Sequence, residues 1–246
     1  MARNPYFRFQ QFTVFHDKCA MKVGTDGTVL GAWVDVGHAK RALDIGTGTG
    51  LISLMIAQKN TDLQIDAIDI ESNAIQQAET NVAQSPFSKR IRLCQTAMQD
   101  FAAADTRYDV IVTNPPFFTE TLKSPDKKRA IARHADSLTA EELICFSAQR
   151  LTDNGRLSVI YPYEYRDRLI SLGREYNIYP SRITNLYPTP QSAPKRILLE
   201  FSKTEKGPIE NDLIIETERH VYSDEFKYLM KDFYLKEIAK NRFHSE

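Results

Sequence analysis

The residues of this 246-residue chain best suited to chemistry are Asn114-Pro115-Pro116-Phe117, which place hydrogen-bond acceptors beside an aromatic ring. An exocyclic amine on a nucleobase is a poor nucleophile because its lone pair is delocalised. A side-chain amide oxygen and a backbone carbonyl that both accept its N–H groups favour the nucleophilic geometry, and so stabilise the transition state. The prolines restrict the backbone, and Phe117 can stack on the base. The tetrapeptide predicts a clamp for a planar amine. A proline-rich turn that only closes a strand is the alternative.

A buried strand is expected directly before this tetrapeptide. Residues Tyr108 to Thr113 form a short run that is rich in β-branched residues, which favours a strand over a helix. Asn114 then stands at the carboxyl end of the strand. Ligands of open α/β sheets bind beyond these carboxyl ends.

A glycine-rich loop upstream predicts a nucleotide-like ligand. Glycines occur at 46, 48 and 50, between an apolar strand that contains Asp44 and a helix from Leu51 to Lys59. A dinucleotide fingerprint places its third glycine one residue later, where Leu51 stands. Asp69 ends the next strand, where an acid suits a ribose diol. The combination predicts S-adenosylmethionine, bound through Asp44, Gly46, Gly48, Gly50 and Asp69.

The remaining pattern predicts a doubly wound, mostly parallel α/β sheet, because strand and helix signals alternate. A helix capped by Ser72 and ended by Pro86 is expected, then a strand at 91–95. Thr139 and Glu142 form a capping box for a helix to Leu151. A turn at Asn154-Gly155 leads into a strand at 157–161, and 163–176 reads as a helix.

The C-terminal part differs from this alternation. Runs at 181–187 and 197–202 are separated by a short proline-rich connection, which predicts an antiparallel hairpin. Ser223 then precedes a helix with one apolar face, most simply a packing face. That face is made of Phe226, Leu229, Met230, Phe233 and Ile238.

Composition agrees with a single enzyme domain and argues against a metal protein and a membrane-spanning protein. Lys plus Arg and Asp plus Glu number 32 each, so the global charge does not indicate a nucleic-acid partner. The three cysteines, Cys19, Cys94 and Cys145, lack metal or redox spacing, and no metal is expected. The longest uncharged run has 14 residues, against the ~20 that a membrane helix needs. A cytoplasmic protein is expected, with a monomer favoured.

The chain resembles class I S-adenosylmethionine-dependent methyltransferases with an Asn/Asp-Pro-Pro-aromatic signature. Residues 7–14, His16 to Gly27 and Ala193 to Arg196 narrow this resemblance to the bacterial tRNA(1)(Val) (adenine(37)-N6)-methyltransferases. The resemblance implies N6-methylation of the adenosine just 3′ of the anticodon. It also implies a seven-stranded Rossmann-like sheet with a C-terminal antiparallel hairpin. The expected division of this single domain is an N-terminal hairpin or cap segment 1–38, a cofactor-binding catalytic core 39–203 and a C-terminal extension 204–246 with strand and helix.

Further cofactor contacts follow from the same resemblance. Asp100 matches the position that binds the adenine amine in related enzymes, and an N-cap is its alternative reading. Lys22 and Thr25 lie in an N-terminal segment that contacts the methionine end in similar enzymes. A plain hairpin turn explains Gly24 and Gly27 almost as well, and Phe7, Phe9, Phe12 and Phe15 read as a strand pair packed on the core.

RNA contacts are expected at two places. A basic run begins six residues past Phe117, where a target strand must approach, although a solvated loop is the alternative. Lys195 and Arg196 form the second place, and Phe118 is a further substrate contact. The basic residues of the first place are Lys123, Lys127, Lys128, Arg129 and Arg133.

Two other functions compete with adenine methylation. The same tetrapeptide type serves guanine-N2 and protein glutamine methylation, because each presents an sp² nitrogen. Guanine-N2 rRNA enzymes are the closer rival, and Phe118 replaces the His that some of them carry. An S-adenosylmethionine-binding RNA module without activity is the rival outside enzymes, and the intact Asn114, Asp44 and Asp69 argue against it.

Overall fold

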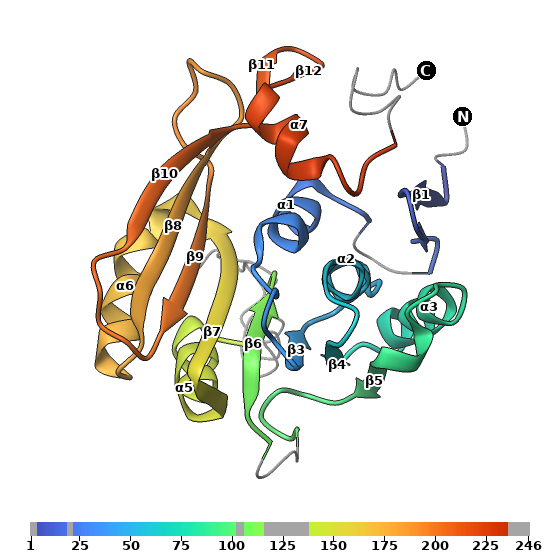
Figure 1. The fold of residues 1–246 in the computed structure, drawn as a ribbon, viewed down its shortest axis with the longest axis horizontal. Helices are drawn as coiled ribbons and strands as arrows, with labels where there is room; N and C mark the ends of the chain where they lie inside the picture. Colours follow the sequence, from blue (N-terminus) through green and yellow to red (C-terminus); the bar gives the residue numbers. More distant parts are fainter. Residues whose placement is uncertain (1–3, 19–21, 102–105, 116–137, 236–246) are drawn as a thin grey trace, which may run out of the picture.

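Aliphatic and β-branched runs of the chain form the strands of one central sheet (Figure 1). The computed structural model describes residues 4–18, 22–101, 106–115 and 138–235. Within them the sheet has eight strands in the order β10-β8-β9-β7-β6-β3-β4-β5. The expected doubly wound α/β fold is therefore confirmed.

The parallel part of the sheet positions the chemistry. Strand β3 pairs in parallel with both β4 and β6, and β4 pairs with β5 and β6 with β7 in the same sense. All five strands therefore end at one edge of the sheet. They are β3 (Arg41–Ile45), β4 (Gln64–Asp69), β5 (Ile91–Gln95), β6 (Tyr108–Thr113) and β7 (Leu151–Pro162).

The expected C-terminal hairpin is present, and a strand of the C-terminal extension joins the sheet beyond the seven strands expected. Strand β9 (Arg196–Ser202) runs antiparallel to both β7 and β8 (Tyr179–Tyr187). Strand β10 (Ile209–Ile214) adds to β8 in parallel and makes an eighth strand beyond the seven expected. Its Glu210, Asn211 and Asp212 are exposed. Polar residues are common on edge strands, where they discourage further pairing, and they conceal the strand signal.

Helices cover both faces of the sheet. On one face, α1 to α3 share a core cluster with α7, whereas α5 and α6 pack on the other face with a second cluster (Figure 1). The α-helices are α1 (Thr25–Trp33), α2 (Leu51–Lys59), α3 (Ser72–Ala83), α5 (Ala140–Arg150), α6 (Arg166–Glu175) and α7 (Asp224–Met230). The described residues also form the 3₁₀ turns η1 (Ser88–Arg90) and η2 (Tyr163–Tyr165). No helix of the described residues has the length and apolar character needed to cross a membrane.

The helix caps agree with the sequence in two cases out of three. The capping box of Thr139 and Glu142 is complete at the start of α5, and the Ser223 hydroxyl accepts from the Phe226 amide at the start of α7. The expected Ser72 cap was wrong: Ser72 is the first residue of α3, and Glu71 is the N-cap. The Asp69 carboxylate accepts from the Glu71 amide at 3.0 Å, so an upstream side chain orders the entry into α3.

Strand β7 begins earlier than the sequence indicates. The expected turn at Asn154-Gly155 was wrong, because both residues lie inside β7. The register between β6 and β7 shifts between Tyr108 and Val110, where two residues of β6 lie opposite five residues of β7. A Cβ on Gly155 would lie 2.7 Å from the Tyr108 carbonyl oxygen. The glycine thus permits a close backbone approach and does not mark a turn.

We predict that Gly155→Ala destabilises the fold by about 1–3 kcal/mol, the usual cost of overpacking against backbone that cannot move away. The same substitution at Gly207 is the matched control, since nothing lies within 4 Å of its Cβ position. Urea unfolding followed by circular dichroism gives both values. Equal stability of the two variants would show that the Tyr108 contact is not limiting.

The N-terminal hairpin and the C-terminal segment pack on each other. Strands β1 (Tyr6–Arg8) and β2 (Thr13–Phe15) pair antiparallel, as expected for a strand pair on the core. The Gln10 side chain between them donates to the carbonyls of Lys231 and Tyr234. A two-stranded sheet of β11 (Glu216–Glu218) and β12 (Val221–Tyr222) precedes α7. The apolar face expected there extends past α7 to the buried Phe233, while Ile238 lies outside the described residues.

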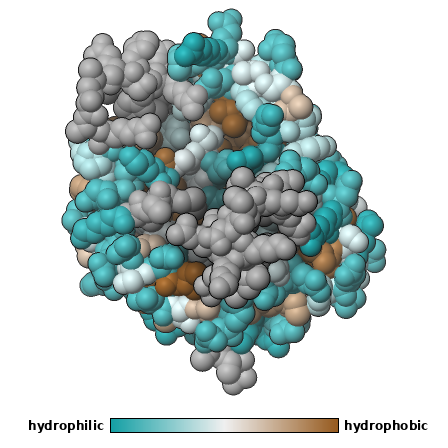
Figure 2. All heavy atoms as spheres, turned by 180° about the vertical axis from the view of Figure 1, so that it is seen from behind, coloured by the Kyte–Doolittle hydropathy of each residue, from teal (hydrophilic) through white to brown (hydrophobic). Residues whose placement is uncertain are grey.

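The exposed hydrophobic side chains of the described residues come from separate elements. The molecular face in Figure 2 is largely hydrophilic, with small brown areas between polar ones. Ile70 is 50% exposed and directly follows Asp69. This side chain places apolar surface at the carboxyl edge of the sheet. The other large examples are Tyr6, Ile209, Val221 and Tyr228.

Candidate active site at the carboxyl edge

Three of the predicted site residues lie side by side because of the strand register. Ile45 in β3 pairs with Ile68 in β4 and with Thr113 in β6. Each pairing partner is followed by one residue of the site, so Gly46, Asp69 and Asn114 end three adjacent strands at one level. The Thr113 hydroxyl fixes this alignment further by donating to the Ile45 carbonyl at 2.8 Å. The structure thus brings the glycine loop, the acid and the clamp together.

The glycine loop adopts backbone conformations that favour glycine. Gly46, Gly48 and Gly50 have φ of 69°, 57° and 79°, all in the left-handed region. A Cβ on Gly46 or Gly48 would meet no atom within 4 Å, so backbone conformation rather than crowding selects glycine at these two positions. The Gly46 and Thr47 amides both donate to the Ile68 carbonyl, which holds the loop on the end of β4.

Asp69 anchors the glycine loop as well as ending its strand. One carboxylate oxygen accepts from the Gly48 amide at 2.8 Å and the other from the Glu71 amide at 3.0 Å. A carboxylate has about four acceptor positions, so each oxygen retains capacity for another donor. The side chain is half-buried and therefore still accessible. The loop-anchoring role was not foreseen from the sequence, which indicated only a ribose contact.

Asp44 is fully buried beneath the loop, and only one of its oxygens is satisfied. Its Oδ2 atom accepts from the hydroxyls of Thr47 and Ser53, both at 2.7 Å. Its Oδ1 atom has no hydrogen-bond partner among the described residues. Burial raises the pKa of Asp44 to about 6, the nearby Asp69 charge adds to this, and the two hydroxyls oppose it. A buried acceptor without a donor is costly, so this oxygen marks a place for a donor group.

The raised pKa of Asp44 predicts a pH-dependent stability of the ligand-free protein. Between pH 3.8 and about 6 the folded state holds a proton that the unfolded state has lost, so this stabilisation disappears as pH rises through about 6. The free energy of unfolding should be about 1 kcal/mol higher at pH 5 than at pH 7.5 from this group alone. Urea unfolding of wild type and Asp44→Asn at both pH values isolates the effect. A pH-independent difference between the two proteins contradicts it.

Helix α1 lies directly against the clamp. Asn114 is half-buried and Pro115 is buried. A Cβ on Gly27 of α1 would lie 3.8 Å from the Asn114 side-chain nitrogen and 3.1 Å from the Leu51 side chain. The hairpin-turn reading of Gly24 and Gly27 was wrong, because Gly24 is the N-cap of α1 and Gly27 lies inside it.

Lys22 and Thr25, the predicted contacts at the methionine end, flank the start of this helix. Lys22 is exposed before α1, and Thr25 is the first helical residue. Asp100 is exposed in the turn after β5, next to β4 in the sheet. It follows the carboxyl end of β5, which is Gln95, by five residues. Its role as an adenine contact stays a prediction.

Two buried polar residues that the sequence reading missed connect the N-terminal segment to the glycine loop. Asn81 of α3 accepts from the Phe15 amide and donates to the carbonyls of Phe15 and Thr49. Gln77, one helical turn earlier, accepts from the Lys18 amide. Their sequence signal was the i, i+4 spacing of two amides on the face of α3 that also carries Ala74 and Ala78.

The connection between β8 and β9 reaches the same edge. Arg196 pairs with Pro162 at the end of β7, and its Nε atom lies 2.7 Å from Asp26 in the first turn of α1. This ion pair links the hairpin to the helix that packs on Asn114. Lys195 is exposed beside it. The structure thus places both predicted RNA contacts near the clamp, with the Arg196 charge partly balanced by Asp26.

Several predicted residues lie outside the described part of the chain. They belong to the segment directly after Pro115, so the structure does not place them. They are Pro116, Phe117, Phe118, Lys123, Lys127, Lys128, Arg129 and Arg133. Among the residues that are described, no three His, Cys, Asp or Glu side chains are grouped to hold a metal ion.

Comparison with known proteins gives a consistent assignment. Residues 19–170 match the family model of the methyltransferase small domain. A tRNA1(Val) (adenine(37)-N6)-methyltransferase from Parabacteroides distasonis is 49% identical over 95% of this chain and 99% of its own length. Relatives with the same name from Bacteroides thetaiotaomicron and Trichodesmium erythraeum are 46% and 45% identical, each over 94% of this chain and 98% of their own length.

Among solved structures, a predicted O-methyltransferase from Agrobacterium tumefaciens has a TM-score of 0.68 at 18% identity, and covers 85% of this chain and 96% of its own. That likeness concerns the fold alone. The sequence identity over nearly the full length, together with the glycine loop, Asp69 and Asn114 at one edge of the sheet, shows that the chain belongs to the family of tRNA1(Val) (adenine(37)-N6)-methyltransferases.

Proposed function

We propose that the protein transfers a methyl group from S-adenosylmethionine to N6 of adenosine 37 in tRNA1(Val). The observation that carries this proposal is the alignment of Gly46, Asp69 and Asn114 at the ends of three adjacent strands. It places a cofactor loop directly beside acceptors for an amine. The names of relatives at 45–49% identity supply the choice of nucleoside and RNA.

The donor and acceptor set of the site fits this cofactor. The unpartnered Asp44 Oδ1 is a buried acceptor beneath the loop, suited to the ammonium group or to a water bound to it. Asp69 retains acceptor positions for a ribose diol, and the exposed Ile70 next to it offers apolar surface to a flat ring. When bound, S-adenosylmethionine supplies an electrophilic methyl group on a sulfonium. The open space at Gly46 and Gly48 lets a ligand approach the backbone closely.

The protein contributes mainly position and hydrogen bonding to the reaction. The Asn114 side-chain oxygen and the Pro115 carbonyl accept the two N–H groups of the adenine amine and localise its lone pair. Phe117 stacks on the base after it is flipped from the anticodon loop. No dedicated general base is required, because the methylated amine is cationic and acidic enough to lose its proton to water.

Preorganisation of the clamp is supported from three directions. Thr113 is tied to Ile45, proline follows Asn114, and Gly27 of α1 packs beside its amide. An acceptor held in place before substrate arrives stabilises the transition state without reorganisation. We infer that α1 holds Asn114 in position by packing beside it and takes no direct part in the reaction.

The proposal extends to the domain organisation, the remaining contact residues, the location in the cell and the oligomeric state. We infer one methyltransferase domain over 1–246, with an N-terminal segment 1–38, a core 39–203 and an extension 204–246. The packing of β1–β2 and α7 into the first core cluster supports this unit. The RNA contacts are Phe118, Lys127, Arg129, Arg133, Lys195 and Arg196, and further cofactor contacts are Lys22, Thr25 and Asp100. We propose that the protein acts in the cytoplasm, as a monomer.

Methylation of tRNA from cells that lack the gene tests the proposed function. Purified protein, labelled S-adenosylmethionine and this tRNA should give N6-methyladenosine, identified by mass spectrometry of nucleosides and mapped to position 37. A transcript with guanosine at that position is the control and should accept no label there. N2-methylguanosine as the product would favour the guanine-N2 reading, and no incorporation into any RNA would favour a binding module.

A further inference from the structure

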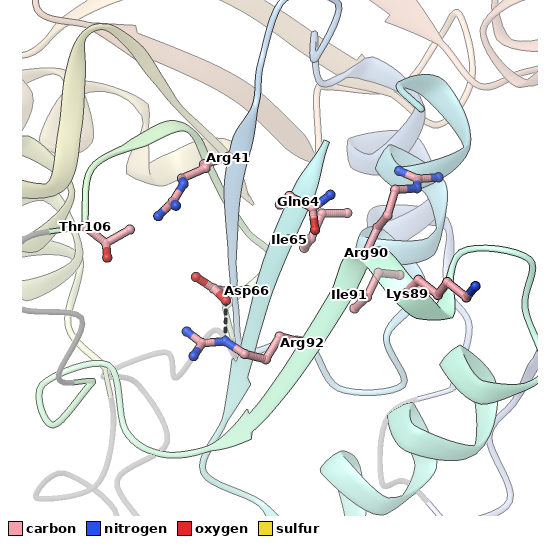
Figure 3. A pocket seen from close by; sticks show the side chains of 9 residues that line it. All are labelled: Arg41, Gln64, Ile65, Asp66, Lys89, Arg90, Ile91, Arg92 and Thr106. Atoms are coloured by element: carbon pink, nitrogen blue, oxygen red, sulfur yellow. Dashed lines mark hydrogen bonds and ion pairs between the residues drawn. The ribbon is translucent and has the colours of Figure 1, made fainter. Parts of the chain in front are cut away.

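A basic depression lies at the opposite end of the strands from the clamp. It encloses about 440 Å³ and is lined by the first residues of three parallel strands, Arg41 of β3, Gln64 of β4 and Ile91 of β5 (Figure 3). Pockets of about 300 Å³ or more accommodate small ligands. The depression is therefore large enough for a phosphate group with its neighbouring sugar. Its remaining lining residues are Ile65, Asp66, Lys89, Arg90, Arg92 and Thr106.

The charge of this depression contrasts with that of the whole chain. Four positive side chains, from Arg41, Lys89, Arg90 and Arg92, surround one carboxylate, which leaves a net charge of +3. The full chain has a net charge of zero. A local excess of positive charge of this size attracts anions. Because the charges line a depression in the protein surface, their electric field is stronger there than on a flat surface.

The single carboxylate is already occupied. One Asp66 oxygen lies 2.7 Å from Arg92 Nε and the other accepts from the Tyr108 hydroxyl at 2.8 Å. Burial, together with this hydrogen bond, raises the pKa of Tyr108 well above its usual value, so the phenol remains a donor at physiological pH. Asp66 thus orients Arg92 and leaves the two terminal guanidinium nitrogens without a partner in the described part of the chain.

The four cations divide into fixed and available groups. Arg90 donates to the carbonyls of Ala57, Asn60 and Leu63, so its guanidinium is held by the fold. Arg41 and Lys89 are exposed, and neither side chain has a hydrogen bond or ion pair with any described residue. Figure 3 shows Arg41 and the Arg92 guanidinium on one side of the depression and Lys89 on the other. Donors therefore line the depression across more than one strand.

We propose that this depression binds the phosphodiester backbone of the RNA substrate, away from the methylated base. Arginine forks and a lysine point charge match phosphate oxygens, and Gln64 and Thr106 add neutral donors. A strand of five or six residues is about 17–20 Å long. A structured RNA with a base at the carboxyl edge reaches this distance easily, since protein modules contact RNA duplexes over about 16 base pairs. The inference rests on the proposed function, because it takes tRNA as the ligand.

Substitution of the two available cations tests the site. In Arg41→Gln/Lys89→Gln, the dissociation constant for full-length tRNA1(Val) transcript should rise about 10-fold in 0.15 M salt, measured by fluorescence anisotropy. The slope of log affinity against log salt should fall by about 1.4 to 1.8, the change for two lost phosphate contacts. The charge reversal Arg41→Glu/Lys89→Glu should weaken binding further. The affinity for S-adenosylmethionine should stay at the wild-type value, because neither residue lies at the carboxyl edge.

Lys206→Gln/Arg219→Gln is the matched control, since it removes two exposed positive charges elsewhere. It should leave the salt slope and tRNA affinity at wild-type values. If Arg41→Gln/Lys89→Gln binds tRNA as tightly as this control while the wild type methylates tRNA, the proposed binding site is wrong and the proposed function stands. Binding of inorganic phosphate to the depression in calorimetry would not change that conclusion. If the wild-type protein binds tRNA without methylating it, the proposed function is wrong, and the comparison of tRNA affinities between the variants still tests the binding site. A wild type that does not bind tRNA overturns both.

Discussion

Replacement of Asn114 by alanine should lower kcat for tRNA methylation by about 10²-fold, the range for losing one preorganised hydrogen-bond partner of a reacting group. The loss falls on kcat because the amide oxygen acts on the lone pair of the attacking nitrogen, which changes most in the transition state. The dissociation constant for S-adenosylmethionine should be unchanged, because the loop residues and Asp69 keep their hydrogen bonds. Single-turnover methyl transfer and calorimetry give the two values.

Asn114→Asp is the matched variant. It keeps a side-chain oxygen at the same distance from the backbone and should retain more activity than alanine. Asp and Asn side chains have nearly the same size and shape, so the substitution should preserve the packing of residue 114 beside Gly27. An alanine variant within threefold of wild type, or one that loses rate only through weaker cofactor binding, contradicts the role of Asn114 as a clamp.

Asp69→Ala should weaken S-adenosylmethionine binding roughly 10²-fold. The carboxylate accepts from Gly48 and Glu71 and has positions left for a diol. Hydrogen bonds to a charged group contribute about 1.5–3 kcal/mol each, so losing two to the ligand costs about 3–6 kcal/mol, and the lower end of that range corresponds to about a 10²-fold loss of affinity. Calorimetric titration of the ligand-free protein measures it directly.

Asp69→Asn separates the two roles of this side chain. The amide oxygen can still accept from the Gly48 amide and hold the loop, whereas the negative charge is lost. We expect roughly a 10-fold weaker affinity for this variant. Thermal unfolding of both variants shows how far the loop depends on the anchor. Wild-type cofactor affinity in Asp69→Ala would rule out the ribose contact.

The position of the site followed from the sequence because parallel strands end at a common edge. The strand before Asn114 and the strand before the glycine loop had clear β-branched and apolar signals, and the register at Ile45 converts these signals into proximity. The glycine spacing predicted a loop that a ligand approaches closely, and the structure adds that all three loop glycines have positive φ. Sequence signals for the strands were therefore enough to place those site residues that stand at the end of a strand.

Helix α1 escaped prediction because tertiary contacts, not propensity, form it. Gly27 and Gly31 both disfavour a helix. A Cβ on Gly31 would lie 2.7 Å from the Met55 sulfur, so the glycine serves close packing of α1 on α2. The irregular register at Gly155 and the pairing of β10 at the edge of the sheet were missed for the same kind of reason. Each depends on a neighbour distant in sequence, which composition and periodicity do not report.

The contact of Gln10 with residues 231–234 has a consequence for how the protein folds. The partners are separated by more than 220 positions, so the intervening chain must be synthesised before they meet, and contacts of such separation form late. The N-terminal hairpin that Asn81 fastens to the glycine loop is therefore held on both sides only after residues 231–234 have been synthesised. On a translating ribosome, the described strands of the central sheet, the last of which ends at Ile214, are therefore synthesised before this second contact of the hairpin can form.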